Sequence, residues 1–316
     1  MEPYLIIAIV TASLAVAALA ISYVCYRMAF RRKNDDENDF FSFDDGVLKP
    51  HAEHIRSMKA ELDSYPHESV EITSRDGVRL CAEFYPVEGA DMTEIQFHGY
   101  RSAAKRDFAC GGCEAIRKKH NLLLVDQRAH GKSGGKTISF GIKERFDALD
   151  WIDYLCQRLG KDTEILLFGV SMGAATVLMA SEFDLPDNVC CVVADCSYSS
   201  PEAIIKSVIR DMHLPPSLAF PFVRLGGLIF GSFDVSSASP VEAVKHTKAP
   251  TMIIHGEADS FVPYEMGCEI YSSLAAKKRE MHSFPGADHG TSYLSDRERY
   301  LGEVKRFTEE SRGERT

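Results

Sequence analysis

The chain has 316 residues, of which 45% are hydrophobic and 26% are charged, and a formal net charge of −10. This is ordinary globular composition, and the length suffices for one large α/β domain with an appendage. The sequence has no basic stripe, which argues against nucleic acid as a partner. Nine scattered cysteines without the spacing of a disulfide framework fit a reducing compartment.

The first predicted element is a membrane-spanning helix formed by the apolar run Tyr4–Tyr26. At 1.5 Å per residue this run would be about 34 Å long, which is enough to cross a bilayer. A secretory signal peptide has a basic start, whereas this chain opens with Met1-Glu2-Pro3. The stretch Ala18-Leu19-Ala20 is similar to a cleavage site, but the apolar run continues beyond it. We therefore expect an uncleaved span.

Residues 1–33 are thus predicted to form a membrane anchor with a basic flank. The basic residues follow the apolar run: Arg27, Arg31, Arg32 and Lys33. By the positive-inside rule, this arrangement places the rest of the chain in the cytoplasm. The sequence predicts a single-pass protein of the cell membrane with its N-terminus outside.

Residues 34–66 are predicted to connect the anchor to the globular domain. The segment 34–45 is acidic and is expected to be a solvated linker. The segment 51–65 has a helical pattern and is expected to lead into the globular domain or lie against it. Three apolar residues share one face of this short juxtamembrane helix: Ile55, Met58 and Leu62.

The globular domain, predicted at residues 67–312, begins with a hairpin, because alternating runs at 70–74 and 78–85 flank an Asp76-Gly77 turn signal. Apolar strands and helical stretches then alternate. Strands are expected at 95–97, 122–125, 165–168, 190–194, 252–254 and 281–284, and helices at 105–119, 142–159, 174–181, 264–276 and 295–310. This pattern predicts the α/β class, with a mostly parallel, doubly wound sheet whose functional groups gather at the C-terminal strand ends.

Two loops follow the first parallel strands. In Phe97-His98-Gly99-Tyr100, the glycine allows a backbone to approach a reaction centre, and the N–H of Tyr100 is a predicted oxyanion donor. His98 is interpreted as a residue that orients this loop. The Gly-rich loop Asp126–Gly134 lacks the Lys-Ser/Thr ending of a phosphate-binding loop. Asp126 and Arg128 are therefore expected to brace the loop.

The strongest local signal is Gly169-Val170-Ser171-Met172-Gly173, a G-x-S-x-G between an apolar strand and a helix. In such a sharp turn the glycines avoid clashes, and the central serine projects above the sheet edge. Ser171 is the predicted nucleophile. The N–H of Met172, at the helix N-terminus, is the second predicted oxyanion donor. The alternative is an ordinary tight turn with an incidental serine.

The segment 199–240 interrupts the alternation of strands and helices. It contains a predicted helix at 203–212 and an apolar stretch at 218–230 that, with Arg224 in its middle, is too short to span a membrane. We interpret the segment as a small helical lid whose apolar face shapes an acyl pocket or touches the bilayer. A mere packing insertion is the alternative. The candidate substrate-binding residues are Phe220, Phe222 and Leu225.

Two loops late in the chain supply the partners that a serine nucleophile requires. A serine hydroxyl needs a base to take its proton, and an imidazole base needs a carboxylate to fix its tautomer. His289 is the predicted base, because a Gly-flanked histidine in a loop has little packing role. Asp259 is the predicted acid. Three other carboxylates remain as alternatives for that role: Asp195, Glu257 and Asp288.

From about Val70 to Phe307 the chain resembles the α/β-hydrolase superfamily. The resemblance rests on five motifs in the family order: His98-Gly99, the Asp126–Gly134 loop, the G-x-S-x-G, Asp259 with Val262-Pro263, and Asp288-His289-Gly290. Within the superfamily, the chain is most similar to membrane-anchored bacterial esterase-like hydrolases of the prolyl-oligopeptidase-like, serine-aminopeptidase-like branch. The Phe97–Tyr100 loop is also similar to the oxyanion loop of acetyl-xylan and cephalosporin deacetylating esterases. The resemblance implies the same roles for the nucleophile, acid, base and oxyanion donors named above.

The sequence therefore predicts a membrane-anchored serine hydrolase that cleaves carboxylic esters through an acyl-enzyme. No metal or organic cofactor is expected, and Cys110-Gly-Gly-Cys113 is interpreted as helix packing because no second ligand pair accompanies it. An aminopeptidase-like peptidase or an acyl-thioesterase would use the same triad. A non-catalytic binding protein of this fold is less favoured, because such proteins usually lose the nucleophile or the base. The expected partners are a small acyl substrate and the membrane.

Overall fold

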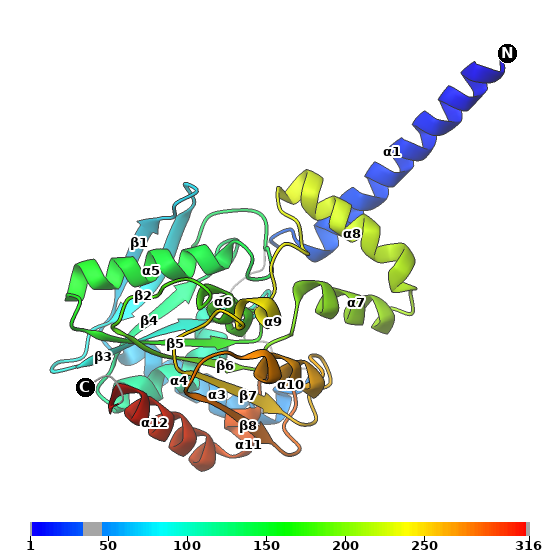
Figure 1. The fold of residues 1–316 in the computed structure, drawn as a ribbon. Helices are drawn as coiled ribbons and strands as arrows, with labels where there is room; N and C mark the ends of the chain where they lie inside the picture. The colour runs from blue at the N-terminus through cyan, green and yellow to red at the C-terminus, as the bar shows by residue number, and fades with distance from the viewer. Residues whose placement is uncertain (1, 34–45, 314–316) are drawn as a thin grey trace.

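The computed structural model describes residues 2–33 and 46–313, so the predicted acidic linker 34–45 lies outside the described residues. In this part of the chain, one eight-stranded sheet is flanked by helices on both faces (Figure 1). The strands run in the order β1-β2-β4-β3-β5-β6-β7-β8 across the sheet. Their bounds are β1 (Glu68–Thr73), β2 (Arg79–Tyr85), β3 (Met92–Phe97), β4 (Asn121–Asp126), β5 (Glu164–Val170), β6 (Val189–Asp195), β7 (Thr251–Gly256) and β8 (Arg279–Phe284).

The sheet is antiparallel at one edge and parallel elsewhere. β1 and β2 form the predicted hairpin, β2 also pairs antiparallel with β4, and the pairs from β4 to β8 are all parallel. Gly77 in the hairpin turn has φ +83°, a conformation that suits glycine. Every residue of β3, β6 and β7 is buried, as expected for strands covered on both faces. The predicted mostly parallel, doubly wound sheet is confirmed.

Two apolar cores lie on the two faces of the sheet. One contains Phe108 and Phe307, and the other contains the fully buried Trp151. The predicted apolar face of the juxtamembrane helix is confirmed, because Ile55, Met58 and Leu62 are all buried in the first core. The helices on that face are α3 (Ala52–Ser64, after the 3₁₀ turn η1, Lys49–His51), α4 (Ala104–Arg117), α11 (Ser292–Ser295) and α12 (Arg297–Gly313). The other face carries α5 (Glu144–Leu159), α6 (Met172–Ala180) and α10 (Tyr264–Ser273).

The N-terminal helix α1 (Pro3–Ala29) projects away from the body of the molecule (Figure 1). Its most apolar window has a mean hydropathy of 2.6 and is only 6% buried. By length and composition, α1 suits a membrane span or a signal sequence. Only its C-terminal part reaches the rest of the chain, where Tyr26 and the following Phe30 are buried.

The insertion after β6 packs against this end of α1. It consists of α7 (Pro201–Asp211), α8 (Pro216–Gly231) and the short α9 (Pro240–Ala243). α8 and α1 approach closely at Gly226 of α8, where a Cβ would lie 2.4 Å from the carbonyl oxygen of Ser22 on α1. The ring of Phe230 lies 5.0 Å from that of Tyr23 and 5.9 Å from that of Tyr26. An apolar face of the insertion is thus covered by the N-terminal helix.

Candidate active site

Ser171 stands between the end of β5 and the first residue of α6, with φ 55° and ψ −116°. Such a positive φ is costly for a residue with a side chain. Two glycines permit the turn. A Cβ at Gly169 would lie 2.2 Å from the carbonyl oxygen of Gly173, and a Cβ at Gly173 would lie 1.8 Å from that of Phe97. The strand, sharp turn and helix expected around the G-x-S-x-G are therefore present.

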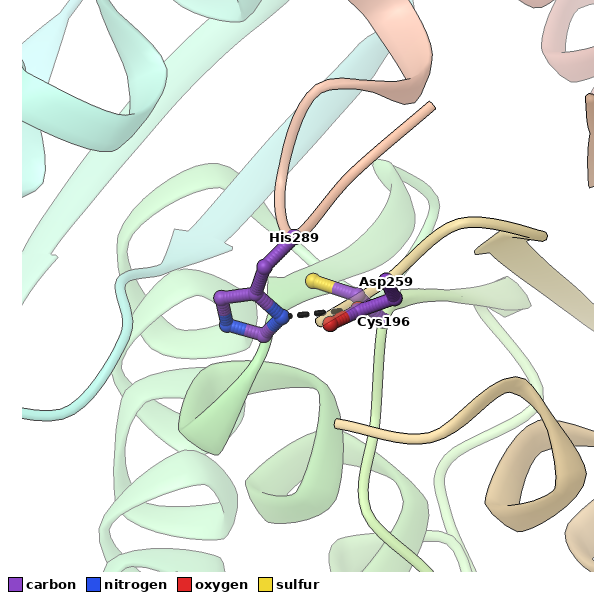
Figure 2. A group of neighbouring side chains, drawn as sticks. All are labelled: Cys196, Asp259 and His289. Carbon is purple, nitrogen blue, oxygen red and sulfur yellow. Dashed lines mark hydrogen bonds and ion pairs between the residues drawn. The ribbon is translucent and has the colours of Figure 1, made fainter. Parts of the chain in front are cut away.

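The structure brings Ser171, His289 and Asp259 together. His289 Nε2 lies 3.0 Å from Ser171 Oγ, and His289 Nδ1 lies 2.8 Å from Asp259 Oδ2. Figure 2 shows the imidazole of His289 directed at the carboxylate of Asp259. The serine and the aspartate are buried, and the histidine is half-buried. These distances allow a proton to pass from the hydroxyl to the imidazole while the carboxylate orients the ring.

Asp259 is held as a carboxylate. Burial opposes its ionisation, but hydrogen bonds from His255 and His289 outweigh that cost and lower the pKa of Asp259 well below its usual range. The backbone N–H groups of Phe261 and Val262 donate to Oδ1 at 2.9 and 2.7 Å. His255 Nε2 lies 3.4 Å from Oδ2 and 2.9 Å from the carbonyl oxygen of Val262. The carboxylate is therefore fixed from several sides opposite His289.

The three alternative acids do not contact the imidazole of His289 in the described part of the chain. Asp195 ends β6 as predicted, yet its carboxylate faces α12. Each alternative has a different partner: Asp195 accepts from the Tyr300 hydroxyl, Glu257 from the Ser283 hydroxyl, and Asp288 from the backbone N–H groups of Ser260 and His289. The geometry thus favours Asp259 among the four carboxylates.

The loop after β3 lies directly beside the serine. A Cβ at Gly99 would lie 3.5 Å from Ser171 Cβ, so the loop backbone passes close to the hydroxyl. Within the described residues, the N–H groups of Tyr100 and Met172 donate to no protein acceptor. Met172 is the first residue of α6, where the helix dipole favours negative charge. Both N–H groups are therefore available to an oxygen of a bound molecule.

The surrounding side chains hold these loops in place. His98 accepts the N–H of Gln127 on Nε2 at 3.1 Å, which joins the two predicted loops as expected for an orienting residue. Arg128 pairs with the buried Asp147, so it braces its loop as predicted. Sequence reasoning missed His255 beside the acid. It also missed Asp107, whose Oδ2 accepts the N–H of Gly99 at 2.7 Å, because nothing in a helical pattern singles out one carboxylate that bonds the loop before the helix.

A cavity of about 390 Å³ opens at Ser171 and His289 and lies between the sheet and α4, α11 and α12. Phe108, Phe168 and Val304 contribute apolar lining. The three residues predicted to bind substrate do not line it: Phe220, Phe222 and Leu225. They belong to the insertion, where Phe220 is buried in a cluster shared with α1. These residues therefore do not shape this cavity as predicted, because the apolar face of the insertion packs on α1 instead.

Cys196 lies beside the same aspartate and histidine, with ligand-type atoms of all three within 4.8 Å of one another (Figure 2). Burial and the nearby carboxylates of Asp195 and Asp259 raise the pKa of the Cys196 thiol well above its ordinary value. A metal site needs the thiolate, so this sulfur is a poor ligand. The arrangement suits a carboxylate of Asp259 that orients the imidazole of His289 better than it suits metal binding.

Comparisons with known proteins agree with this fold. Residues 108–225 match the family described as alpha/beta hydrolase fold, and residues 230–314 match the prolyl oligopeptidase family. The solved structure of the esterase Pf2001 from Pyrococcus furiosus is similar to this chain, with a TM-score of 0.65 and 25% identity. That similarity covers 79% of this chain and 93% of the esterase. The chain has the α/β-hydrolase fold.

Two bacterial proteins have sequences similar to this chain. The uncharacterised protein YqkD of Bacillus subtilis is 26% identical over 188 residues, which make up 59% of this chain and 61% of YqkD. The uncharacterised protein YfhR of Escherichia coli K12 is 26% identical over 245 residues, or 74% of this chain and 77% of YfhR. The chain thus spans less than two thirds of YqkD and about three quarters of YfhR.

A first prediction concerns Asp195, the buried carboxylate at the end of β6. Burial raises its pKa to about 6, against about 3.9 in an unfolded chain. Because the folded pKa is the higher one, the protonated form favours folding, and this contribution is lost as the pH rises through 6. Relative to Asp195→Asn, the free energy of unfolding of the wild type should therefore fall by roughly 2–3 kcal/mol between pH 4 and 7.5.

Urea unfolding in detergent across that range measures the difference. The exposed Asp153→Asn on α5 serves as the matched control. A difference between wild type and Asp195→Asn that is the same at both ends of the pH range would contradict the account of this carboxylate.

Proposed function

We propose that this α/β-hydrolase cleaves carboxylic esters, with Ser171 as nucleophile, His289 as general base and Asp259 as the orienting acid. The observation that carries the proposal is the unbroken series of contacts from Ser171 Oγ through His289 to Asp259 at the mouth of a cavity. The similarity to Pf2001, an esterase, supports an ester as the substrate.

In the first half of the reaction, His289 Nε2 takes the proton of Ser171 as Oγ attacks the acyl carbon. The new C–O bond forms while the carbonyl electron pair moves onto oxygen. The N–H groups of Tyr100 and Met172 donate to this oxyanion, and Asp259 stabilises the imidazolium. When the tetrahedral intermediate collapses, the ester C–O bond breaks and His289 returns the proton to the leaving alcohol.

In the second half, water replaces the alcohol. His289 removes a proton from the water as its oxygen attacks the acyl-enzyme, and the same N–H groups hold the second oxyanion. The bond from the acyl carbon to Ser171 Oγ then breaks, and the proton on His289 passes to the serine. The carboxylic acid leaves and the resting state is restored.

Peptide hydrolysis is a second candidate, because residues 230–314, which match the prolyl oligopeptidase family, contain both Asp259 and His289. An amine is a poorer leaving group than an alcohol and depends more on protonation by the histidine. A nitrophenyl ester, a thioester and a nitroanilide with the same acyl group separate the possibilities. An esterase hydrolyses the nitroanilide far more slowly than the ester, whereas a peptidase gives comparable kcat/KM for both.

A prediction tests the acid. We expect Asp259→Asn to lower kcat for the ester by about 10⁴-fold, because the amide favours the wrong imidazole tautomer. Glu257→Gln, two residues away, should keep a kcat close to wild type, since Glu257 bonds Ser283 and not the imidazole. Steady-state kinetics of the full-length protein in detergent compares the two. An equal loss in both variants would refute the assignment of Asp259.

We further propose that α1 is a retained membrane span with the hydrolase domain in the cytoplasm. Its hydropathy supports this topology, as do the four basic residues in its last turn and just after it: Arg27, Arg31, Arg32 and Lys33. The chain just after α1 is also bonded to the domain: Ile138 donates its N–H to the carbonyl oxygen of Phe30 at 2.7 Å, and Arg32 donates to that of Lys136 at 2.9 Å. Removal of α1 as a signal sequence would cut the chain close to these contacts.

Labelling of intact cells with a membrane-impermeant maleimide tests the topology. A cysteine introduced by Glu2→Cys should be labelled, whereas one introduced by Gly302→Cys, on α12, should react only after lysis. Labelling of the Gly302→Cys protein in intact cells would contradict the proposed orientation.

A further inference from the structure

The cavity that opens at Ser171 has polar groups on its strand floor. Glu94 and Gln96 are two residues apart on β3, so their side chains lie on the same face of the sheet, and both line the cavity. Both are buried, at 4% and 1% exposure. Gln96 pairs in register with Phe168, three residues before Ser171, which places it roughly 10 Å along the strand direction from the nucleophile.

The orientation of the Gln96 amide follows from its neighbour. Its Nε2 donates to Glu94 Oε2 at 3.0 Å, and the other oxygen of Glu94 lies 2.9 Å from Nδ1 of His120. If the amide of Gln96 were flipped, its oxygen would lie against the carboxylate of Glu94, and two acceptors would face each other. Oε1 must therefore face away from Glu94. Among the described residues, this buried Oε1 has no hydrogen-bond partner. An unpaired buried acceptor is costly unless a ligand or water supplies a donor.

We propose that Gln96 and Glu94 form a distal subsite that binds a hydrogen-bond donor, a hydroxyl or an ammonium group, at the far end of the substrate. This inference deepens the proposed function, because it names a substrate with an apolar middle and a donor at its tip. The apolar lining by Phe108 and Phe168 accommodates the middle. A plain alkyl chain would instead leave Oε1 buried without a partner.

Alkyl fluorophosphonates test the subsite, because they react with an activated serine. Their alkyl chain can take the place of either the acyl part or the alcohol part of an ester. The probes are octyl, ω-hydroxyoctyl and ω-aminooctyl fluorophosphonate, applied to the full-length protein in detergent. The hydroxyl or the amino reagent should inactivate the wild type about 5- to 10-fold faster than the octyl reagent. Gln96→Met should remove this preference, and the exposed Gln157→Met should retain it.

The outcomes separate the two proposals. If no reagent modifies Ser171, the proposed hydrolase function fails. If all three modify Ser171 at equal rates, or if Gln96→Met keeps the preference, the function stands and the subsite is wrong. A faster hydroxyl reagent indicates a polyol-like substrate, and a faster amino reagent indicates a cationic one.

A second inference comes from the end of α1. The last carbonyl groups of a helix have no donors within the helix. Here the Tyr100 hydroxyl donates to the carbonyl oxygen of Ala29 at 2.7 Å, and Arg101 Nη2 donates to those of Met28 at 2.7 Å and Arg31 at 3.2 Å. Two consecutive side chains of the loop after β3 therefore cap the N-terminal helix.

These contacts reach the reaction centre through the backbone. Tyr100 carries the proposed oxyanion N–H, and its ring stacks under the guanidinium of Arg101 at 4.9 Å. Burial raises the pKa of the Tyr100 hydroxyl to about 12, so it keeps its proton and donates throughout the neutral range. The ring also packs on Phe140, which contacts Phe30 at the end of α1.

From these contacts we infer that the C-terminal turn of α1 is a positioning element for the oxyanion loop, so that the membrane helix supports catalysis as well as anchoring. This inference also rests on the proposed function, and it is independent of the distal subsite. It makes the hydroxyl of Tyr100 a positioning group, distinct from the backbone N–H of the same residue.

Two Tyr→Phe variants of the full-length protein in lipid nanodiscs test the inference. Tyr100→Phe removes the bond to the carbonyl oxygen of Ala29, whereas the control Tyr26→Phe removes a hydroxyl–hydroxyl bond from α1 to Thr137. Tyr100→Phe should lower kcat for an ester about 3- to 10-fold without a matching change in KM. The melting temperature should change equally in both variants, and Tyr26→Phe should keep the wild-type kcat.

A wild-type kcat for Tyr100→Phe, or an equal loss of kcat in both variants, would overturn the inference. Fluorophosphonate labelling of Ser171 in the same samples reports on the proposed function separately. Wild-type protein that is not labelled would contradict that function itself.

Discussion

The site depends on one close approach between backbones, the contact of Gly173 at the start of α6 with the carbonyl of Phe97 at the end of β3. No side chain fits there, since a Cβ would lie 1.8 Å from that oxygen. The approach packs α6 against the strand ends and holds Ser171 at φ 55°. It also brings the loop that begins at Phe97 close to the hydroxyl of Ser171. One steric constraint therefore determines the positions of the serine and of both proposed oxyanion donors. The energetic cost of the strained serine is borne by the buried packing of α6 on both sides.

The second organising feature is the contact between the N-terminal helix and the domain. The insertion after β6 turns an apolar face to α1, with Gly226 at the closest point. The end of α1 is bonded in addition to the loop after β3 and to residues 136–138. A helix that is joined to its domain in this way has a fixed orientation relative to it. The cavity lies between the sheet, α4 and α12, and no residue of the insertion lines it, so the insertion and the cavity are separate parts of the molecule.

Much of this fold was readable from local patterns. Parallel strands buried on both faces have nearly continuous apolar sequences. The G-x-S-x-G lies between a strand and a helix, where its glycines indicate a sharp turn. The meeting of Ser171, Asp259 and His289 also follows from topology, because all three come after the C-terminal ends of parallel strands. The specific contacts of individual polar side chains were not readable. The bond of Asp107 to Gly99, the approach of His255 to Asp259 and the unpaired oxygen of Gln96 depend on side-chain positions that carry no periodic signal.

The insertion shows where sequence reasoning is ambiguous in principle. An apolar face such as that around Phe220 predicts burial but not the partner that covers it, and a substrate, a bilayer and another helix are equivalent by hydrophobicity alone.

The most direct measurement is therefore fluorophosphonate labelling of the full-length protein in membranes, wild type against Ser171→Ala. The account predicts that the wild type is labelled and that labelling disappears with the serine hydroxyl. Equal labelling of both proteins, or a folded wild type that is not labelled, would contradict the claim that Ser171 is an activated nucleophile.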